Sequence, residues 1–590
     1  MIEQYLSDEK IQGVLIRIRC KMADQRHRAC FAPMLCAISV GEEHQPDIYS
    51  LFPPRRKWPT LSEEERKDRR ECTSIDNNIL CLTRKVNKEN HREGEHPDWY
   101  NNLQRAVNEI REMIQSPKLK FKSLHISAEE KDRDDDEKLI VCRPICSFQD
   151  YKERAVISLL NKILTELFDA HFQECSYAFR SSKKKEKDCA KDKEKIPAHI
   201  HAVQKIIDFR KAHKDVPLWV AECDLKKFYD TIDHDVIIDS LQDMLHRCIV
   251  CGEIEKEESN LIENGVRAYL DSYNFYSNVL QYNTKPYSKV WKVIPHRTGF
   301  TLRFEWVEKD IDKLRDRWPY RTENHEQHSL GVPQGGAISG LIANLILNRI
   351  DERIMPYVDP ENLIYLRFCD DMIIIGAEKE KVEKVFGVYQ QTARELRLFQ
   401  HDPIGINYPY TKDHWSSKTK EPYRWDAMSK GGIPWVSFVG IDVRHTGQVR
   451  IRRKTILKHM IKQEKVVWEV LRSMKDKGPR YSKEKTLRIM QGHLDAMGVG
   501  RIEYWNYKNN PNTGSWCNAF KIIDNNRWSR HQLKILDRHK QSVVHKFKKK
   551  IDKLTYRKMK YHGEGAHTMR FIPEMRGKPC SYFGQVLKLW

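Results

Sequence analysis

The stretch that decides the fold is YLRFCDDMIIIG, from Tyr365 to Gly376, in which two runs of β-forming residues flank adjacent carboxylates. The runs predict a β-hairpin over residues 363–376, with Asp370 and Asp371 at its turn. Placing two carboxylates between apolar strands costs free energy unless a cation neutralises them. Mg²⁺ prefers oxygen ligands, so the pair is a candidate metal site. An acidic turn that binds nothing is the alternative, because Asp is common in turns.

A third carboxylate lies upstream, in the segment VAECDLKKFYDTIDH from Val220 to His234. Residues 217–240 are typical of a strand followed by a helix, and Asp224 ends the strand. Two Mg²⁺ ions about 3.5–4 Å apart need at least this many acids. In nucleotidyl transfer the protein supplies mainly position and charge, so such a cluster suits that chemistry.

A glycine-rich loop lies between these acids, in SLGVPQGGAISGLIANLILNRID from Ser329 to Asp351. Its glycines let the backbone approach a ligand closely, and Gln334 is its long polar side chain. The apolar run 341–350 predicts a buried helix directly after the loop. The loop therefore lies at a helix N-terminus, which favours anions.

Taken in order, the three segments resemble the palm motifs of reverse transcriptases. Asp224, followed by Phe228 and Tyr229, resembles the first motif. The segment Gly331–Gly336 resembles the PQGG motif, and Phe368–Asp371 resembles the aromatic-x-Asp-Asp motif. An ordered set of this kind is far more specific than any one member.

Other segments resemble group II intron, retron and related bacterial reverse transcriptases. They are Arg143-Pro144 with Arg154 in the fingers, Ser176–Arg180 (SYAFR), Phe438–Gly440 at the primer grip, and Gly447–Arg452 leading into the thumb. The resemblance implies an α+β fold of the right-hand polymerase type, with fingers, palm and helical thumb. We expect an N-terminal extension over 1–95, fingers over 96–215, palm over 216–445 with an insertion at 248–328, thumb over 446–510, and a basic helical extension over 511–590.

The resemblance also implies residue roles. Asp224, Asp370 and Asp371 would be catalytic and, with the Leu225 carbonyl, would bind Mg²⁺, with Mn²⁺ as the alternative. Tyr229 would exclude a 2′-hydroxyl; a core tyrosine is the alternative. The implied nucleotide-binding residues are Arg143, Tyr229, Gln334, Gly335 and Lys412. The implied nucleic-acid-binding residues are Arg180, Phe438, Gly440, Arg450, Arg452 and Arg453. A surface salt bridge is the alternative for Arg143, and a solvated strand edge for the last three arginines.

The composition also favours a protein that binds nucleic acid. The 590 residues carry a net charge of +21, which favours a polyanionic partner such as nucleic acid. The 15 cysteines, without a secretory signal at the start of the sequence, predict free thiols and a cytoplasmic protein. No run of 18 apolar residues occurs, so we expect no membrane partner.

Two further features are a pair of closely spaced cysteines and a basic stretch near the end of the sequence. Cys248 and Cys251 form a CxxC beside His246, but no second CxxC or HxxxH at zinc spacing accompanies them. We interpret them as ordinary helix cysteines, with a zinc site as the alternative. In the basic stretch 540–560, Phe547 and the aromatic and sulfur side chains that follow favour a nucleic-acid groove over a solvated helix face.

The predicted function is RNA-directed DNA synthesis from dNTPs on an RNA template, with a DNA product. By analogy with defence-associated and abortive-infection reverse transcriptases, the template is predicted to be a dedicated noncoding RNA in antiphage defence. A homo-oligomer or a partner protein is compatible with this prediction. The alternatives are a group II intron reverse transcriptase and maturase, an RNA polymerase, and a non-catalytic RNA-binding scaffold on a polymerase fold.

Overall fold

The computed structural model describes residues 2–29, 35, 47–69, 72–134, 136, 138–181, 198–214, 216–279, 301–304, 329–403, 418–500, 515–553 and 580–587. The chain divides into two compact units. The first comprises Met1–Ile18, Pro97–Cys189 and Asp215–Ile433, and the second comprises Arg19–His96, Ala190–Lys214 and Pro434–Trp590. The predicted N-terminal extension is thus divided between both units, and part of the predicted fingers, residues 190–214, belongs to the second.

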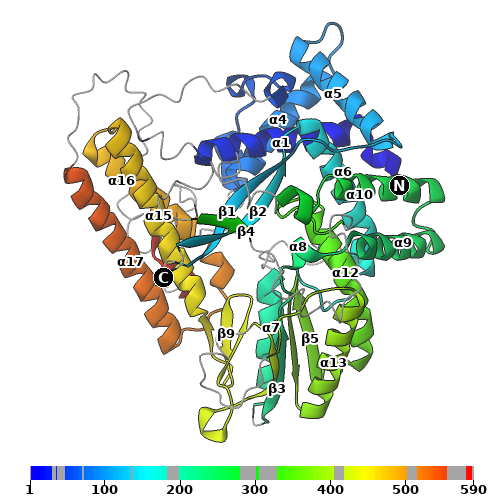
Figure 1. Cartoon of the computed structure of the whole chain (residues 1–590). Coiled ribbons are helices and arrows are strands. Elements are labelled where there is room, and N and C mark those ends of the chain that lie inside the picture. The colour runs from blue at the N-terminus through cyan, green and yellow to red at the C-terminus, as the bar shows by residue number, and fades with distance from the viewer. Residues whose placement is uncertain are drawn as a thin grey trace. The chain divides into compact units, whose positions relative to one another are not determined.

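A four-stranded antiparallel sheet is the centre of the first unit, in the order β5-β6-β3-β7. The strands are β3 (Leu218–Cys223), β5 (Leu363–Phe368), β6 (Asp371–Gly376) and β7 (Lys420–Trp425). The predicted hairpin over 363–376 is confirmed as β5 and β6. Ile373, Ile374 and Ile375 of β6 are fully buried. Helix α13 (Lys379–Glu395) packs against β3, β6 and β7 and lies alongside the sheet in Figure 1.

The helices of the first unit include α5 (Asp98–Gln115) and α6 (Tyr151–Phe168). The predicted helices after β3 and after the glycine loop are confirmed as α9 (His234–Val250) and α12 (Ser339–Ile354). Helix α12 is the expected buried helix, and it packs between α9 and α13. From the predicted insertion, α10 (Lys256–Asp271) packs on α5, α6 and α9. Residues 280–300 and 305–328 of that insertion lie outside the described residues.

A second sheet, in the order β1-β2-β4, completes the first unit. Its strands are β1 (Leu124–Asp134), β2 (Leu139–Phe148) and β4 (Thr301–Phe304). β1 and β2 pair antiparallel. Tyr273, Phe275 and Phe304 bury one face of this sheet. Shorter elements are η1 (Ile2–Tyr5), η4 (Asp169–His171), α8 (Phe228–Thr231), η5 (Phe275–Val279), η9 (Met355–Tyr357) and η10 (Met428–Lys430).

The second unit is mostly helical, as predicted for the chain after Lys454. It contains the sheet β8 (Trp435–Phe438), β9 (Ile441–Arg444) and β10 (Val449–Ile451), and the helices α15 (Arg453–Lys477), α16 (Lys483–Val499), α17 (Arg527–Asp552) and α18 (Tyr582–Leu587). The remaining elements are η2 (Asp47–Leu51), η3 (Arg55–Lys57), α3 (Glu63–Asp68), α4 (Ser74–Asn90), α7 (Ala198–Ala212) and η11 (Asn518–Phe520). Helix α1 (Asp8–Ala29) contributes residues to both units.

The helices α15 and α17 lie side by side (Figure 1). Their shared core includes Val470, Leu494 and Phe547, all fully buried. The prediction that Phe547 lines a nucleic-acid groove is therefore wrong, because its ring belongs to the core. Tyr556 and Met559 lie outside the described residues. Among the described helices, none combines the length and the hydropathy needed to cross a membrane.

Candidate active site

The sheet register brings the predicted catalytic acids to one end of β3 and β6. Cys223 pairs with Met372, so Asp224 and Asp371 are the next residues along the same two strands. Asp371 also pairs with Phe368, which closes the β5–β6 turn around Asp370. Because antiparallel pairing sets these positions, residues about 150 apart in the sequence meet at one edge of the sheet.

Electrostatics show that two of the acids are close. Burial raises the pKa of Asp370, and the negative charge of Asp224 raises it further. Neighbouring like charges disfavour ionisation in this way. Asp370 is half-buried, whereas the Asp371 side chain is exposed.

A lysine and a histidine face Asp224. Its Oδ2 lies 2.5 Å from the Nζ of Lys418 and 3.6 Å from the Nε2 of His401. Burial, followed by the charge of Lys418, lowers the pKa of His401 to about 4. Sequence reasoning missed Lys418, and Lys412, the predicted lysine, lies outside the described residues.

The donor set fits a hard divalent cation, because it consists of carboxylate oxygens and one of them is buried beside a like charge. The carboxylate oxygens of the three acids do not yet lie close together. Within the described residues, the three acids are not a group whose ligand atoms all lie within 4.8 Å of one another. Leu225, the predicted carbonyl ligand, follows Asp224 and bridges to Gln400. Binding of a cation would require the carboxylates to approach and Lys418 to release Asp224.

Tyr229 lies against the acid-bearing turn. Its hydroxyl is 3.1 Å from the Sγ of Cys369, the residue before Asp370. Burial and the neighbouring Cys369 raise the pKa of Tyr229, so the phenol stays neutral. Cys369 itself has a φ of 59°, a left-handed conformation that is uncommon for a residue with a side chain. The turn that carries Asp370 is therefore held in a strained backbone geometry.

The glycine loop runs along α8. The amide of Val332 donates to the carbonyl of Tyr229 at 2.8 Å. Gly331 has a φ of 83°, and a Cβ there would lie 2.9 Å from the carbonyl oxygen of Asp230. At Gly336 a Cβ would lie 1.9 Å from the hydroxyl of Tyr269. The two glycines are needed for this close approach.

Gln334 binds an acid, Asp230, that sequence reasoning missed. The side-chain Nε2 of Gln334 donates to Oδ1 of Asp230 at 2.6 Å. The backbone carbonyl of Gln334 accepts from the amide of Cys146 in β2 at 2.8 Å. Burial raises the pKa of Asp230 to about 6, while Gln334 and Arg143 act to lower it. Arg143 is exposed on β2, and Gly335 is exposed in the loop. The only sequence signal for Asp230 was its position directly after Tyr229.

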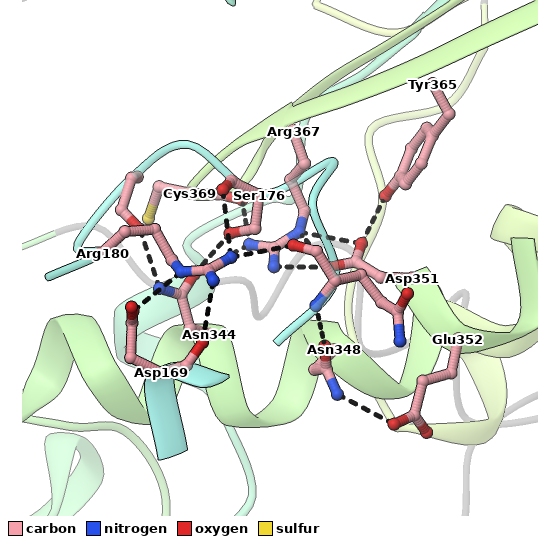
Figure 2. A network of polar contacts seen from close by, with 12 residues as sticks. Asp169, Ser176, Arg180, Asn344, Asn348, Asp351, Glu352, Tyr365, Arg367 and Cys369 are labelled. Atoms are coloured by element: carbon pink, nitrogen blue, oxygen red, sulfur yellow. Dashed lines mark hydrogen bonds and ion pairs between the residues drawn. The ribbon is translucent and has the colours of Figure 1, made fainter. Parts of the chain in front are cut away.

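A buried ion pair lies beneath the turn, shown in Figure 2. Arg367 and Asp351 are both fully buried, and the Nη2 of Arg367 lies 2.6 Å from Oδ2 of Asp351. Arg367 also donates through Nη1 to the carbonyl of Cys369 at 3.2 Å. Burial opposes its charge, but Asp351 outweighs that effect and the pKa of Arg367 is raised. The Arg367 guanidinium therefore stays charged and supports the backbone next to Asp370.

The SYAFR segment joins the same network. Ser176 donates to Oδ1 of Asn344 at 3.1 Å, and Arg367 donates to that oxygen at the same distance. Arg180 binds Oδ1 of Asp169 at 2.8 Å and the carbonyl of Gln173 at 2.8 Å (Figure 2). Arg180 was predicted to bind nucleic acid. Because its guanidinium is used in these internal hydrogen bonds, the structure instead makes it an anchor of the loop.

The other predicted nucleic-acid contacts belong to the second unit. Phe438 is buried, so its ring packs inside the protein, and Gly440 has a φ of 85° in the β8–β9 turn. Arg450 pairs with Asp442 at 2.9 Å and lies 3.9 Å from the centroid of the Trp435 ring. Arg452 and Arg453 are exposed at the start of α15. Their contacts with nucleic acid remain predictions.

Comparison with protein families identifies one match. Residues 286–401 match the model described as reverse transcriptase (RNA-dependent DNA polymerase). The matched residues include Gln334, Asp370 and Asp371 but not Asp224. The predicted α+β polymerase fold is confirmed. Among curated proteins, none matches this sequence.

Solved structures of yeast telomerases are also similar. Apo telomerase from Candida tropicalis is 12% identical, with 81% of this chain and 74% of that chain covered and a TM-score of 0.30. Telomerase from Candida albicans, in complex with a fragment of telomeric RNA, is 12% identical, with 89% and 81% covered and a TM-score of 0.29. At these TM-scores the likeness carries no argument about this chain.

Proposed function

We propose that Asp224, Asp370 and Asp371 hold the catalytic cations of this chain. The premise is that its reverse transcriptase domain makes it an RNA-directed DNA polymerase. The observation that carries the proposal is the convergence of Asp224 and Asp370 at one end of the sheet, where the charge of one raises the pKa of the other. Acids in such an arrangement are stabilised by a divalent cation.

Two Mg²⁺ ions would supply activation of the 3′-hydroxyl and stabilisation of the leaving pyrophosphate. The chain's own residues supply position and charge. The strained turn at Cys369 presents Asp370, and Arg367 supports that turn from below. Lys418 contacts Asp224 at 2.5 Å and can neutralise it until cations bind.

The nucleotide is proposed to lie between the acids and the glycine loop. Tyr229 stands beside Cys369, where its ring would meet the sugar and exclude a 2′-hydroxyl. Exposed Arg143 provides a planar cation suited to phosphate oxygens. The Gln334 side chain is held by Asp230 and its backbone carbonyl by the amide of Cys146, so its position is set before a nucleotide arrives.

The test is incorporation of dNTPs on a primed RNA template with Mg²⁺, and separately with Mn²⁺. We expect Asp224→Asn and Asp370→Asn to abolish incorporation. Asp243→Asn, an exposed substitution on α9, is the matched control and should leave it unchanged. Incorporation by the Asp370→Asn variant at the unsubstituted rate would refute the assignment.

We further propose that the template is a dedicated noncoding RNA and that the enzyme acts in the cytoplasm in antiphage defence. The net charge of +21 supports a polyanionic partner but does not specify it. Sequencing the RNA that copurifies with the protein tests the proposal. One dominant RNA would support it, and an unselective mixture would contradict it.

A further inference from the structure

A second group of ligand-type side chains lies where η4 meets the end of α9. The Nε2 of His171 is 2.9 Å from Oε2 of Glu253 and 3.7 Å from the Sγ of Cys248. The ligand atoms of all three side chains lie within 4.8 Å of one another. Within the described residues, this is the one group of at least three His, Cys, Asp or Glu side chains that meets this distance.

The local fold explains the convergence. Cys248 lies on the fully buried face of α9, and Cys251 caps that helix. Gly252, with a φ of 71°, then reverses the chain, and the amide of Glu253 donates to the carbonyl of Cys248 at 2.9 Å. Glu253 is thereby returned to the side of Cys248. His171 comes from a segment 77 residues upstream of Cys248.

The geometry resembles a metal site more than a surface ion pair. An ion pair needs only His171 and Glu253, yet a thiol approaches the same ring nitrogen. In tetrahedral zinc sites, bonds of about 2.0–2.1 Å to nitrogen and about 2.3 Å to sulfur set the ligands about 3.6 Å apart. The observed separation between sulfur and nitrogen is 3.7 Å, so His171 and Cys248 already stand at ligand spacing. Binding an ion would require Glu253 to move outward and the exposed Cys251 side chain to turn toward the group.

A second thiol is close to the group. Burial raises the pKa of Cys248 to about 12, and the charges of Glu253 and Cys251 act in the same direction. Cys251 is exposed at the C-cap of α9, three residues after Cys248, so its side chain is free of core packing. The spacing Cys-x-x-Cys is also common among zinc ligands.

We propose that His171, Cys248, Glu253 and Cys251 bind one zinc ion. The two thiols bind as thiolates and release their protons to solvent, and His171 binds through neutral Nε2. The site is separate from the catalytic acids and does not depend on their assignment.

The ion would connect α9 to the segment that supports the acid-bearing turn. His171 ends η4, whose first residue, Asp169, binds Arg180. Two residues after His171, the amide of Gln173 donates to Asn348 of α12 at 3.0 Å. The segment then reaches Tyr177, whose amide donates to the carbonyl of Arg367 at 2.9 Å. Zinc is therefore assigned a structural role, holding this segment in place.

The experiment measures zinc in the purified full-length protein by plasma mass spectrometry. We expect about one zinc per chain, retained in an Asp370→Ala/Asp371→Ala variant that lacks the catalytic acids. His171→Gln and Cys248→Ser should each lower zinc affinity at least tenfold in a competition with a chromophoric chelator. His246→Gln, an exposed substitution on the same helix, and Cys72→Ser are the matched controls and should retain the metal.

Two substitutions of exposed side chains keep the test valid if the Cys248 variant fails to fold. Cys251→Ser and Glu253→Gln should also lower the affinity at least tenfold. Replacing zinc by cobalt should give a thiolate-to-metal absorption band that falls to about half its intensity with Cys251→Ser, because Cys248 remains as the second thiolate ligand. A zinc-free native protein with no such band, or zinc affinity unchanged by these two variants, would overturn the proposal.

Discussion

The two units bury polar groups in different ways. Beneath the turn that carries Asp370 in the first unit, Arg367 and Asp351 form an ion pair with no exposed surface. In the second unit, the Nε2 of buried His459 lies 2.7 Å from the hydroxyl oxygen of Tyr582. The same hydroxyl accepts a hydrogen bond from the Nε2 of Gln463 at 2.6 Å. The first network is charged, and the second is neutral.

The difference follows from what each network supports. Arg367 binds the carbonyl of Cys369, so its charge acts on the strained backbone next to Asp370. The His459 network joins α15 to α18 and contacts the ring of Trp516, where only packing is required. A buried ion pair costs desolvation energy that a neutral network avoids. We infer that the charged network is retained for position rather than for stability.

The largest expected effect separates catalysis from stability in the first unit. Asp370→Asn should lower dNTP incorporation at least about 10³-fold, because several kcal/mol of metal-mediated stabilisation is lost. Without divalent cations the same variant should melt no lower than the unsubstituted protein, since it removes a buried charge repelled by Asp224. Activity assays and thermal denaturation in chelator test both outcomes. A marked fall in melting temperature would show that Asp370 is a structural residue.

The next effect tests the ion pair itself. Asp351→Asn should destabilise the protein by about 3–5 kcal/mol, because Arg367 is left as an uncompensated buried charge. The double variant Arg367→Met/Asp351→Leu should recover most of that stability in denaturant unfolding. It should not recover polymerase activity, because the donor to Cys369 is lost. A double variant with normal activity would refute the positioning role of Arg367.

The neutral network predicts a pH dependence of stability. Burial, followed by the charges of Lys462 and His539, lowers the pKa of His459 to about 4. In the unfolded chain its pKa is 6.5, so between these values only the unfolded state binds the proton, and stability rises with pH. At 1.36 kcal/mol per pH unit, the gain from pH 4 to pH 6.5 is about 3 kcal/mol. Chemical denaturation across this range measures it.

His459→Gln supplies the control for that measurement. Glutamine can still accept from Tyr582 but does not titrate, so this contribution to the pH dependence should disappear. An unchanged pH profile would mean that His459 is not the titrating group.

The smallest effect concerns Tyr229, which contacts the turn that the charged network supports. Tyr229→Ala should raise the use of ribonucleotides relative to deoxynucleotides by about tenfold, equivalent to about 1.4 kcal/mol. Tyr229→Phe keeps the ring and should preserve the selectivity of the enzyme. Competition assays with paired nucleotides give the ratio. If the alanine variant gains no ribonucleotide use, Tyr229 is a packing residue.

Local pattern was sufficient for much of the fold. The β5–β6 hairpin and the buried helix α12 were predicted from short-range periodicity, which the backbone obeys wherever one face is buried. The order of the acids predicted that Asp224 and Asp371 lie near one another, and the pairing of β3 with β6 brings them to one end of the sheet. Such predictions succeed because motif spacing and strand alternation are properties of neighbouring residues.

The sequence by itself determined the reaction class, because the acids and the glycine loop occur in a specific order. Only the tertiary structure decided how these residues are supported. It made Arg180 an internal anchor and Phe547 a core residue, and it placed Lys418 on Asp224. It also brought His171 to Cys248 across 77 residues. Such contacts depend on how separate elements pack, and no local periodicity records the distance between residues on different elements.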